Sequence, residues 1–163
     1  MRYILKQKLV SLGNNFMIKD SAGRDAFRVS GSLLSLGDKL SFQDLTGKEL
    51  IYIEQRTVRR VSSYQVRRDG KYLAEVRRDD PSFLRHRFRI EVRESADLEA
   101  SGDFLDRKYV MRRGNQEIAE MSKRWFRPSE TYTIDIGVSE TDHMLLLAIA
   151  VVIERACRKI QNR

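Results

Sequence analysis

The chain has 163 residues, of which 41% are hydrophobic and 33% charged, and its formal net charge is +8. These values are ordinary for a globular protein and exclude wholesale disorder, and the length predicts a single domain, residues 1–163, with a core of its own. The only cysteine excludes an intramolecular disulfide and favours a reducing compartment. The opening MRYILKQK has no apolar run typical of a signal peptide, so we expect a cytoplasmic protein. The positive charge indicates attraction to polyanions.

Residues 1–137 are typical of short antiparallel strands joined by hairpins. One pattern recurs: alternating apolar residues, a turn containing Asp and Gly, and then further apolar residues. The turns end at Gly23, Gly47 and Gly70, with spacings of about 24 residues, and a weaker relative surrounds Gly114. The aspartates of the first three turns are Asp20, Asp44 and Asp69. We expect them to bond local backbone amides rather than to form a catalytic cluster.

Further strands are predicted between these hairpins. They span residues 3–9, 86–92, 97–105 and 131–136, and the segment 86–92, HRFRIEV, alternates strictly. With the hairpins, the total is about twelve strands, at a spacing typical of a barrel or sandwich.

Residues 139–160 predict a helix of unusual composition. Ser139 or Thr141 is expected to cap its start, and Arg155, Arg158 and Lys159 suit the negative end of the helix dipole. Between these ends, residues 144–153 contain no polar side chain. About ten apolar residues are too few for a membrane span, which needs about twenty. A helix that is apolar all round must be enclosed on every side.

These two observations combine into one fold. A closed barrel of eight strands has room only for its own side chains, whereas an eleven-stranded barrel already encloses a helix. The sequence therefore predicts a mainly β protein, a closed antiparallel barrel of about twelve strands around a central, hydrophobic C-terminal helix.

Residues with catalytic or metal-binding chemistry are few. The two histidines, His86 and His143, have no ligand or triad partner nearby in sequence, and no Walker spacing precedes Gly47 and Lys48. Cys157 lies in the apolar helix, so we interpret it as a buried, inert thiol. We expect no enzymatic activity, no metal and no cofactor.

The middle of the chain carries most of the positive charge. Residues 56–93 contain twelve basic and five acidic side chains, a net charge of +7. If the apolar residues of each strand face inward, the arginines share the outer face, where guanidinium groups suit phosphate. The candidate anion-binding residues are Arg67, Arg77, Arg85, Arg87, Arg89 and Arg93. A solvated exterior without a ligand is the alternative. Tyr64, Tyr72 and Phe88 fall on the predicted inward phase, which disfavours nucleic acid, since its binding needs exposed stacking platforms.

A second candidate surrounds the only tryptophan. Lys123, Arg124 and Trp125 form a possible interfacial group, an aromatic residue with basic neighbours. A core tryptophan in a barrel strand is the alternative.

Several segments resemble the LURP-one-related family. They are residues 16–31, 39–50, 118–125, 131–136 and 142–153, which occur in the family's order over essentially the whole chain. The resemblance implies the tubby C-terminal domain fold, a twelve-stranded barrel around a hydrophobic helix. Tubby proteins bind phosphoinositide headgroups and the related scramblases act at membranes. The cysteine-rich stretch of scramblases is absent here, and no tubby lipid-binding motif transfers residue by residue.

Three functions remain open from the sequence. The first is a non-enzymatic binding or tethering module whose basic face engages anionic phospholipid headgroups, with peripheral membrane association. The second is nucleic-acid binding through the same face. The third is a structural or partner-binding barrel without a polyanion ligand.

Overall fold

The computed structural model describes residues 1–7, 15–32, 37–58, 61–79, 85–103, 108–126 and 129–161. Within these residues the chain forms twelve strands followed by one helix. They are β1 (Arg2–Gln7), β2 (Phe16–Lys19), β3 (Asp25–Gly31), β4 (Lys39–Gln43), β5 (Glu49–Val58), β6 (Val61–Arg68), β7 (Lys71–Arg78), β8 (Arg85–Val92), β9 (Leu98–Asp103), β10 (Lys108–Arg113), β11 (Gln116–Phe126), β12 (Ser129–Ile136) and α1 (His143–Gln161).

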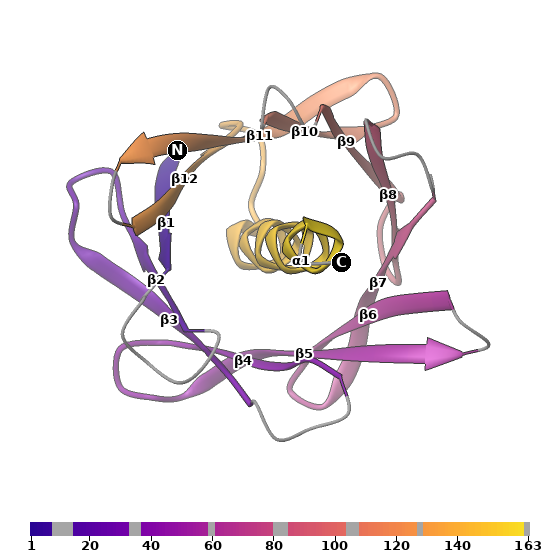
Figure 1. The fold of residues 1–163 in the computed structure, drawn as a ribbon, viewed down its shortest axis with the longest axis horizontal. Coiled ribbons are helices and arrows are strands. Elements are labelled where there is room, and N and C mark those ends of the chain that lie inside the picture. Colours follow the sequence, from indigo (N-terminus) through magenta and orange to yellow (C-terminus); the bar gives the residue numbers. More distant parts are fainter. Residues whose placement is uncertain are drawn as a thin grey trace.

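The strands form one closed antiparallel barrel. Each strand pairs with its neighbours in sequence, and β1 completes the ring by pairing with β12, from Arg2 opposite Asp135 to Lys6 opposite Thr131. In Figure 1 the helix α1 lies inside this ring of strands. The predicted fold, a closed barrel around the C-terminal helix, is confirmed.

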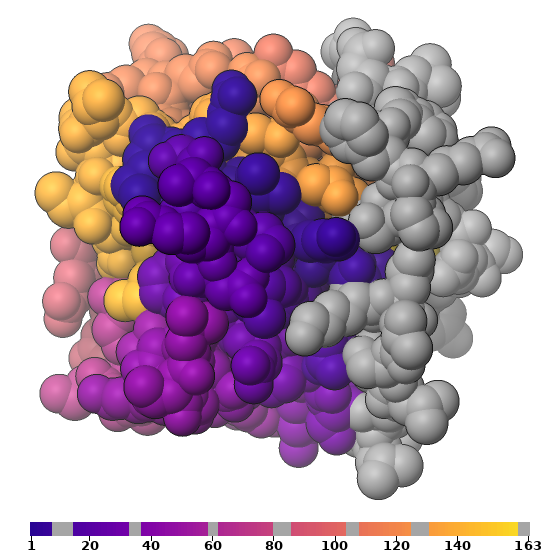
Figure 2. Space-filling model, turned by 90° about the vertical axis from the view of Figure 1, so that its left-hand side faces the viewer, coloured from indigo at the N-terminus to yellow at the C-terminus, as the bar shows by residue number. Residues whose placement is uncertain are grey.

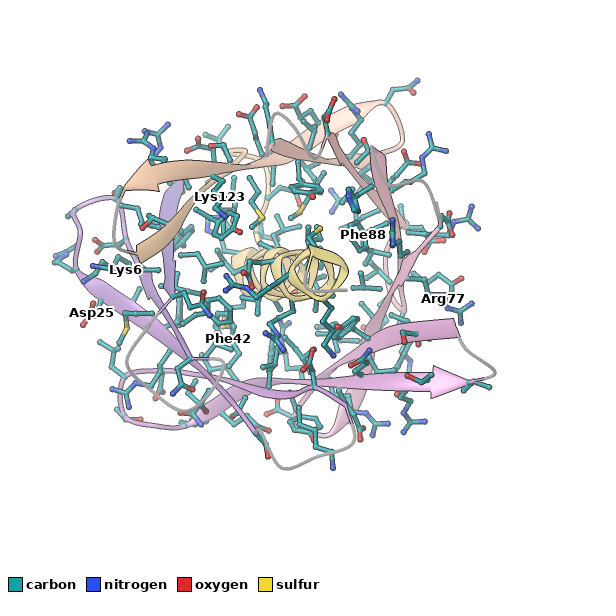
Figure 3. The ribbon with its side chains drawn as sticks, viewed as in Figure 1. Lys6, Asp25, Phe42, Arg77, Phe88 and Lys123 are labelled. Atoms are coloured by element: carbon teal, nitrogen blue, oxygen red, sulfur yellow. The ribbon has the colours of Figure 1, made fainter. Side chains whose placement is uncertain are left out.

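The core is the contact between α1 and the inner face of the barrel. From Leu146 to Ile153 every residue is at most 2% exposed, so the helix is buried on all its faces. Phe42 and Phe88 point from the strands toward the interior, whereas Arg77 points away from it (Figure 3). In Figure 2 the side formed by β1, β2 and β3 is a continuous wall of packed side chains. Among the described residues, no helix has the length and apolarity needed to cross a bilayer.

The start of α1 differs from the prediction. The helix begins at His143, and Asp142 is its N-cap, because its Oδ1 accepts a hydrogen bond of 3.1 Å from the amide of Leu145. The expectation of a cap at Ser139 or Thr141 was wrong. Asp142 is the cap because Arg68 holds it in place, in the linker between β12 and α1. The Arg68 guanidinium donates to both carboxylate oxygens of Asp142 (2.7 and 3.1 Å) and fixes this residue at the end of the barrel.

A second tether holds the same linker. Arg113 donates to both carboxylate oxygens of Glu140, at 2.7 and 3.0 Å. Arg68 and Arg113 are each the last residue of a strand that enters a hairpin turn, on β6 and β10. Paired guanidinium–carboxylate bonds fix geometry as well as charge. The two arginines therefore position the segment that leads into the buried helix.

The hairpin turns use Asp in two ways. The Oδ1 of Asp20 accepts from the amides of Ala22 and Arg24, and the Oδ1 of Asp44 accepts from the corresponding amides two and four residues on. The local bonding predicted for these two turns is confirmed. At the third turn Asp69 and Gly70 both have positive φ, 51° and 73°. This is the two-residue geometry that matches the twist of a hairpin, so Asp69 acts through its backbone conformation.

A β-bulge follows each of the four recurring hairpin turns. The register shifts so that one residue of the returning strand has no direct partner: Ala26, Leu50, Leu73 or Ile118. A bulge lets two consecutive side chains face the same side of a sheet. Ile118 and Ala119 are accordingly both buried, and Leu50 and Leu73 pack against the core. Three of the four bulges, at Leu50, Leu73 and Ile118, therefore add an apolar side chain to the core near the helix entrance.

The bulge on β7 corrects one prediction. Tyr72 was expected to face inward, but the shift makes it the partner of Arg67 and turns Leu73 toward the core instead. Tyr72 is half-buried. This partial burial raises the pKa of its hydroxyl, and the nearby carboxylates of Glu75 and Glu91 raise it further.

Ile149→Asp tests the enclosure of the helix. Ile149 is 0% exposed, so an unpaired carboxylate there should lower the free energy of unfolding by more than about 3 kcal/mol. Val138→Asp is the matched control, because Val138 is 101% exposed and the same change should have little effect. Urea denaturation followed by circular dichroism measures both. Equal stabilities of the two variants would contradict a helix enclosed on all sides.

Candidate anion-binding face

The predicted alternation on β8 places its arginines outside. Phe88 and Ile90 are buried in the core, whereas the side chains of Arg87 and Arg89 are 59% and 61% exposed. Arg77, on the neighbouring β7, is 49% exposed. The backbone of Arg85 belongs to the same strand, but its side chain lies outside the described residues. Three of the predicted arginines therefore share one outer face.

Arg67 and Arg93 lie apart from these three. Arg67 is half-buried between its cross-strand partners Tyr52 and Tyr72, and its Nη2 donates to Oε1 of Gln65 at 3.2 Å. Arg93 is exposed in the connection between β8 and β9, so it is nearer the entrance of the helix. The predicted residues whose side chains are described therefore do not converge on one point.

The strand register arranges the outer face of β5 to β8 in two parallel rows. The arginine row contains Arg56 on β5, Arg77 on β7 and Arg89 on β8, with Ser63 between them on β6. Two residues along each strand, the acidic row contains Glu54, Glu75 and Glu91, with Gln65 on β6. Arg56 was not among the candidates, although its position in the register makes it the third member of the arginine row.

Each described arginine of this face has a carboxylate partner. The nitrogen–oxygen distances are 3.0 Å for Arg77–Glu75, 4.0 Å for Arg56–Glu54, 3.4 Å for Arg87–Glu99 and 3.2 Å for Arg89–Asp79. The hydrogen bond from Arg77 lowers the pKa of Glu75 and raises the pKa of Arg77. An exposed pair such as Arg87–Glu99 contributes only about 0–1 kcal/mol, whereas the Glu75 side chain is only 13% exposed. The arginines are thus neutralised in part, but their partners are exchangeable.

The face is less positive than the charge of residues 56–93 suggests. Glu54 and Glu99 approach it from β5 and β9, outside that stretch of sequence. A count of charges along one stretch of sequence does not include the carboxylates that neighbouring strands contribute to the same face. The face therefore carries a patterned mixture of charges.

The second predicted group does not form one surface. Lys123 is half-buried on the inner side of the strands, with its Nζ 5.6 Å from the centre of the Tyr132 ring (Figure 3). Arg124 is exposed, as strand alternation requires. The side chain of Trp125 lies outside the described residues. Lys123 and Arg124 therefore point to opposite sides of β11.

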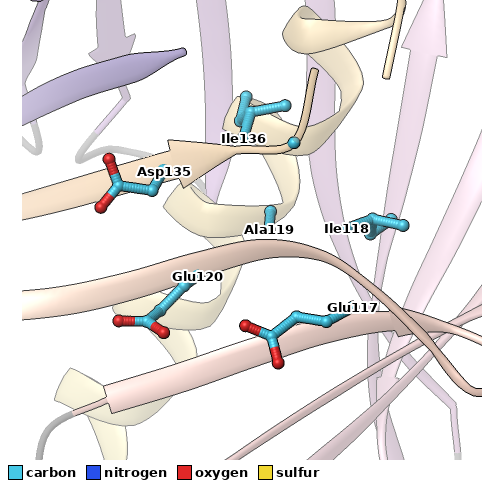
Figure 4. A pocket seen from close by; sticks show the side chains of 7 residues that line it. Glu117, Ile118, Ala119, Glu120, Asp135 and Ile136 are labelled. Atoms are coloured by element: carbon cyan, nitrogen blue, oxygen red, sulfur yellow. The ribbon is translucent and has the colours of Figure 1, made fainter. Parts of the chain in front are cut away.

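A shallow groove of about 300 Å³ lies between the ends of β11 and β12, near the helix entrance (Figure 4). Its carboxylates are Glu117, Glu120 and Asp135. They pair with Arg112 at 3.8 Å, Lys108 at 2.8 Å and Arg2 at 2.7 Å, respectively. Each acid of the groove thus has its own cation. No set of three or more His, Cys, Asp or Glu residues in the described part of the chain is arranged to hold a metal ion.

The thiol and one histidine belong to the interior. The Sγ of Cys157 lies 3.0 Å from the hydroxyl of Tyr109, and burial raises the pKa of the thiol to about 11. His86 is 1% exposed, and its ring centre lies 6.5 Å from that of Tyr109. Gly102 separates these two residues in the register, and a Cβ there would lie 2.4 Å from the Tyr109 ring. The thiol is protonated at neutral pH, so it is not a nucleophile.

The other histidine closes the helix entrance. The Nδ1 of His143 lies 3.0 Å from the hydroxyl of Tyr3, and its Nε2 lies 2.9 Å from the carbonyl of Glu140. The same hydroxyl lies 3.3 Å from the Sδ of Met1. His143 thus links β1 to the linker that precedes α1, which is a structural role.

A buried ion cluster closes the other end of α1. Asp38, which precedes β4, accepts from Arg155 at 2.9 Å, from Lys159 at 2.9 Å and from the Tyr64 hydroxyl at 3.2 Å. Burial alone would raise the pKa of Asp38, but the hydrogen bonds and charges of Arg155 and Lys159 hold it below the usual range. The helix is thereby fastened to the wall at its C-terminal end.

The fold and this face define a closed antiparallel barrel that encloses its own C-terminal helix and presents patterned charge outside. A solved X-ray structure of an Arabidopsis thaliana protein has the same fold, with a TM-score of 0.66 over 95% of this chain and 91% of that one, at 18% identity. The LURP-one-related family model matches residues 1–154. The chain belongs to that family.

One relative is similar along most of its length. "Uncharacterized protein YxjI" of Bacillus subtilis (strain 168) is 30% identical over 150 residues, which are 92% of this chain and 90% of that protein.

Asp38→Asn tests the buried cluster. The change leaves Arg155 buried without its carboxylate, so the free energy of unfolding should fall by about 3 kcal/mol at pH 7. Because the folded pKa of Asp38 is depressed, its contribution exists above the unfolded value of about 4 and disappears as the pH falls through the folded value. The difference between the wild type and the variant should therefore shrink in acid.

Asp135→Asn is the control, since Asp135 forms an exposed pair with Arg2. It should cost less than about 1 kcal/mol in denaturant titrations at the same pH values. A pH-independent difference for Asp38→Asn, or equal costs for the two variants, would contradict the assigned role of Asp38.

Proposed function

We propose that this protein is a non-catalytic binding module that engages anionic phospholipid headgroups through its arginine row. It associates peripherally with a membrane surface, and its barrel serves as a rigid support for the row. The observation that carries the proposal is the register of Arg56, Arg77 and Arg89, which aligns three exposed guanidinium groups across one face.

The chemistry of the row suits phosphate. Guanidinium presents paired donors that match phosphate oxygens, and it is weakly hydrated, so it exchanges partners readily. The existing partners of Arg77 and Arg89 are the carboxylates of Glu75, which is 13% exposed, at 3.0 Å, and of Asp79, which is 35% exposed, at 3.2 Å. A phosphate group replaces the more exposed partner, Asp79, at little cost, because an exposed pair contributes about 0–1 kcal/mol.

Two further observations support the proposal. The net charge of +8 favours an anionic surface, to which each nearby Lys or Arg contributes about 1 kcal/mol. The resemblance of the sequence to the LURP-one-related family also implies the tubby C-terminal domain fold, and tubby proteins bind phosphoinositide headgroups. As part of the proposal, we extend the tubby-like assignment, including headgroup binding, to this chain.

The proposal gives no reacting role to the groups most suited to catalysis. Cys157 is a protonated thiol beside Tyr109, and His143 bonds to Tyr3 and the linker. The module acts by binding alone.

Arg77→Gln/Arg89→Gln tests the proposal. Loss of two cations from the row should weaken binding to phosphatidylcholine vesicles containing phosphatidylglycerol by about 30-fold. Vesicle co-sedimentation at low and at physiological salt measures the partition, and a thermal melt followed by circular dichroism checks the fold.

Lys6→Gln/Arg28→Gln is the matched control, because it removes two exposed cations from one row of β1 and β3, away from the arginine row. It should leave most of the binding intact. Equal losses in the two variants would assign the binding to overall charge. If the wild type ignores the vesicles but shifts single- or double-stranded oligonucleotides at the same salt, nucleic-acid binding replaces the proposal.

A further inference from the structure

The charge order on β7 and β8 is unusual for this barrel. Arg77 lies directly opposite Arg89, and Glu75 directly opposite Glu91. Directly opposed like charges are unfavourable, whereas opposite charges stabilise a sheet by about 0.2–1 kcal/mol per pair. A face selected for stability alone would exchange one Arg–Glu pair along its strand, so that unlike charges faced each other.

Other parts of the same barrel do follow that rule. Arg2 faces Asp135 across β1 and β12, and Arg112 faces Glu117 across β10 and β11. Arg112 also faces Glu99 across β10 and β9. Single like-charge pairs do occur elsewhere, since Glu120 faces Asp135 across β11 and β12 and Arg68 faces Lys71 across β6 and β7. Among the described strand pairs, however, only β7 and β8 place two like-charge pairs of opposite sign side by side, and the same separation of signs extends to Arg56 and Glu54 on β5.

The result is a dipolar stripe, defined here as the arginine row together with the acidic row. Its positive and negative sides are two residues apart along each strand, which is about 7 Å between Cα atoms. The charged ends approach more closely, with Arg77 Nη2 and Glu75 Oε2 3.0 Å apart. A ligand that carries an anion and a cation close together can lie against such a pair in the reverse sense, so that each of its charges meets an opposite one.

We infer that the preferred headgroup carries a primary ammonium beside its phosphate, as phosphatidylserine and phosphatidylethanolamine do. The phosphate contacts the guanidinium groups of Arg77 and Arg89, and the ammonium contacts the carboxylates of Glu75 and Glu91. This inference rests on the proposed function and adds the chemical class of the headgroup. It also explains why the acidic row is present on a face that binds phosphate.

A second copy of the chain is the competing occupant, because a dipolar stripe is complementary to itself after a half-turn. Stable protein interfaces, however, have cores depleted of charged residues and enriched in aromatic and apolar ones. The stripe consists of six charged side chains with Ser63 and Gln65 between them. A layer of mobile, hydrated headgroups fits this composition better than a packed interface does.

The test compares two anionic lipids that carry the same net charge. Phosphatidylserine has an ammonium group and a carboxylate beside its phosphate, whereas phosphatidylglycerol has two hydroxyl groups in their place, so vesicles with equal fractions of either in phosphatidylcholine carry the same net charge and only the former presents an ammonium. With EDTA present, the wild type should bind the phosphatidylserine vesicles about fivefold more tightly. Glu75→Gln/Glu91→Gln should bring that ratio close to one while strengthening binding to phosphatidylglycerol.

Glu117→Gln/Glu120→Gln is the matched control, because it removes two carboxylates from the shallow groove on β11 and should keep the wild-type ratio. Glu91→Gln alone alters only an exposed residue, and it should show a smaller loss of preference. This single variant keeps the inference testable if the double variant does not fold.

The outcomes separate the inference from the proposed function. Equal binding of both vesicles by the wild type, or a preference that survives in Glu75→Gln/Glu91→Gln, overturns the inference and leaves the proposed function standing. Failure to bind either vesicle overturns both. Light scattering that shows a wild-type dimer dissociated by Glu75→Gln/Glu91→Gln assigns the stripe to contact between copies, which also overturns the inference.

Discussion

The structure depends on the burial of one helix that is apolar on all its faces. Each large aliphatic side chain of α1 contributes about 2 kcal/mol when it leaves water, but only if a wall meets it on every side. A closed ring of twelve strands provides that wall without leaving a free sheet edge. Polar groups then fasten the helix at both ends, with Arg68 and Arg113 at its entrance and Asp38 at its exit. Arg68, Arg113 and Asp38 each have hydrogen-bonding partners, as charged groups in partly or fully buried positions require.

This solution determines where the protein is able to bind a ligand. In lipocalin-like barrels the interior holds the ligand, whereas here α1 occupies that space, with Ile149 and its neighbours 0% exposed. Binding is therefore left to the outer faces and the two ends. The barrel in turn makes those faces rigid, since each strand is paired on both sides. Side chains such as Arg77 and Arg89 are held at a fixed spacing although they are individually flexible.

The architecture could be predicted from the sequence because two strong patterns indicate it. The first is the alternation along the strands and the second is the wholly apolar stretch of α1, and few folds bury both the inward side chains of the strands and such a helix. The hairpin turns were predicted from the conformational preferences of Asp and Gly. Finer features depend on contacts that are remote in sequence. The cap at Asp142 is chosen by Arg68, which is 74 positions away, and the carboxylates of the basic face come partly from β5 and β9. The bulges were detectable in principle, since adjacent apolar pairs such as Leu73 and Ala74 interrupt strict alternation at each one. Tyr72 was assigned to the wrong side for that reason.

The order of charged residues on the exterior is not required by the fold. Inward positions such as Phe88 and Ile90 are constrained by packing against α1, but the order of charges outside is free to vary without disturbing the core. Two like-charge pairs across β7 and β8 cost up to about 2 kcal/mol relative to an alternating order, which is a sizeable part of a typical domain stability of about 5–15 kcal/mol. Each large aliphatic side chain of the enclosed helix contributes about 2 kcal/mol, which is enough to offset a cost of this size. A barrel stabilised from within is thus free to keep an electrostatically unfavourable stripe outside, and the two adjacent rows of opposite sign are the reason for proposing a ligand with two opposite charges.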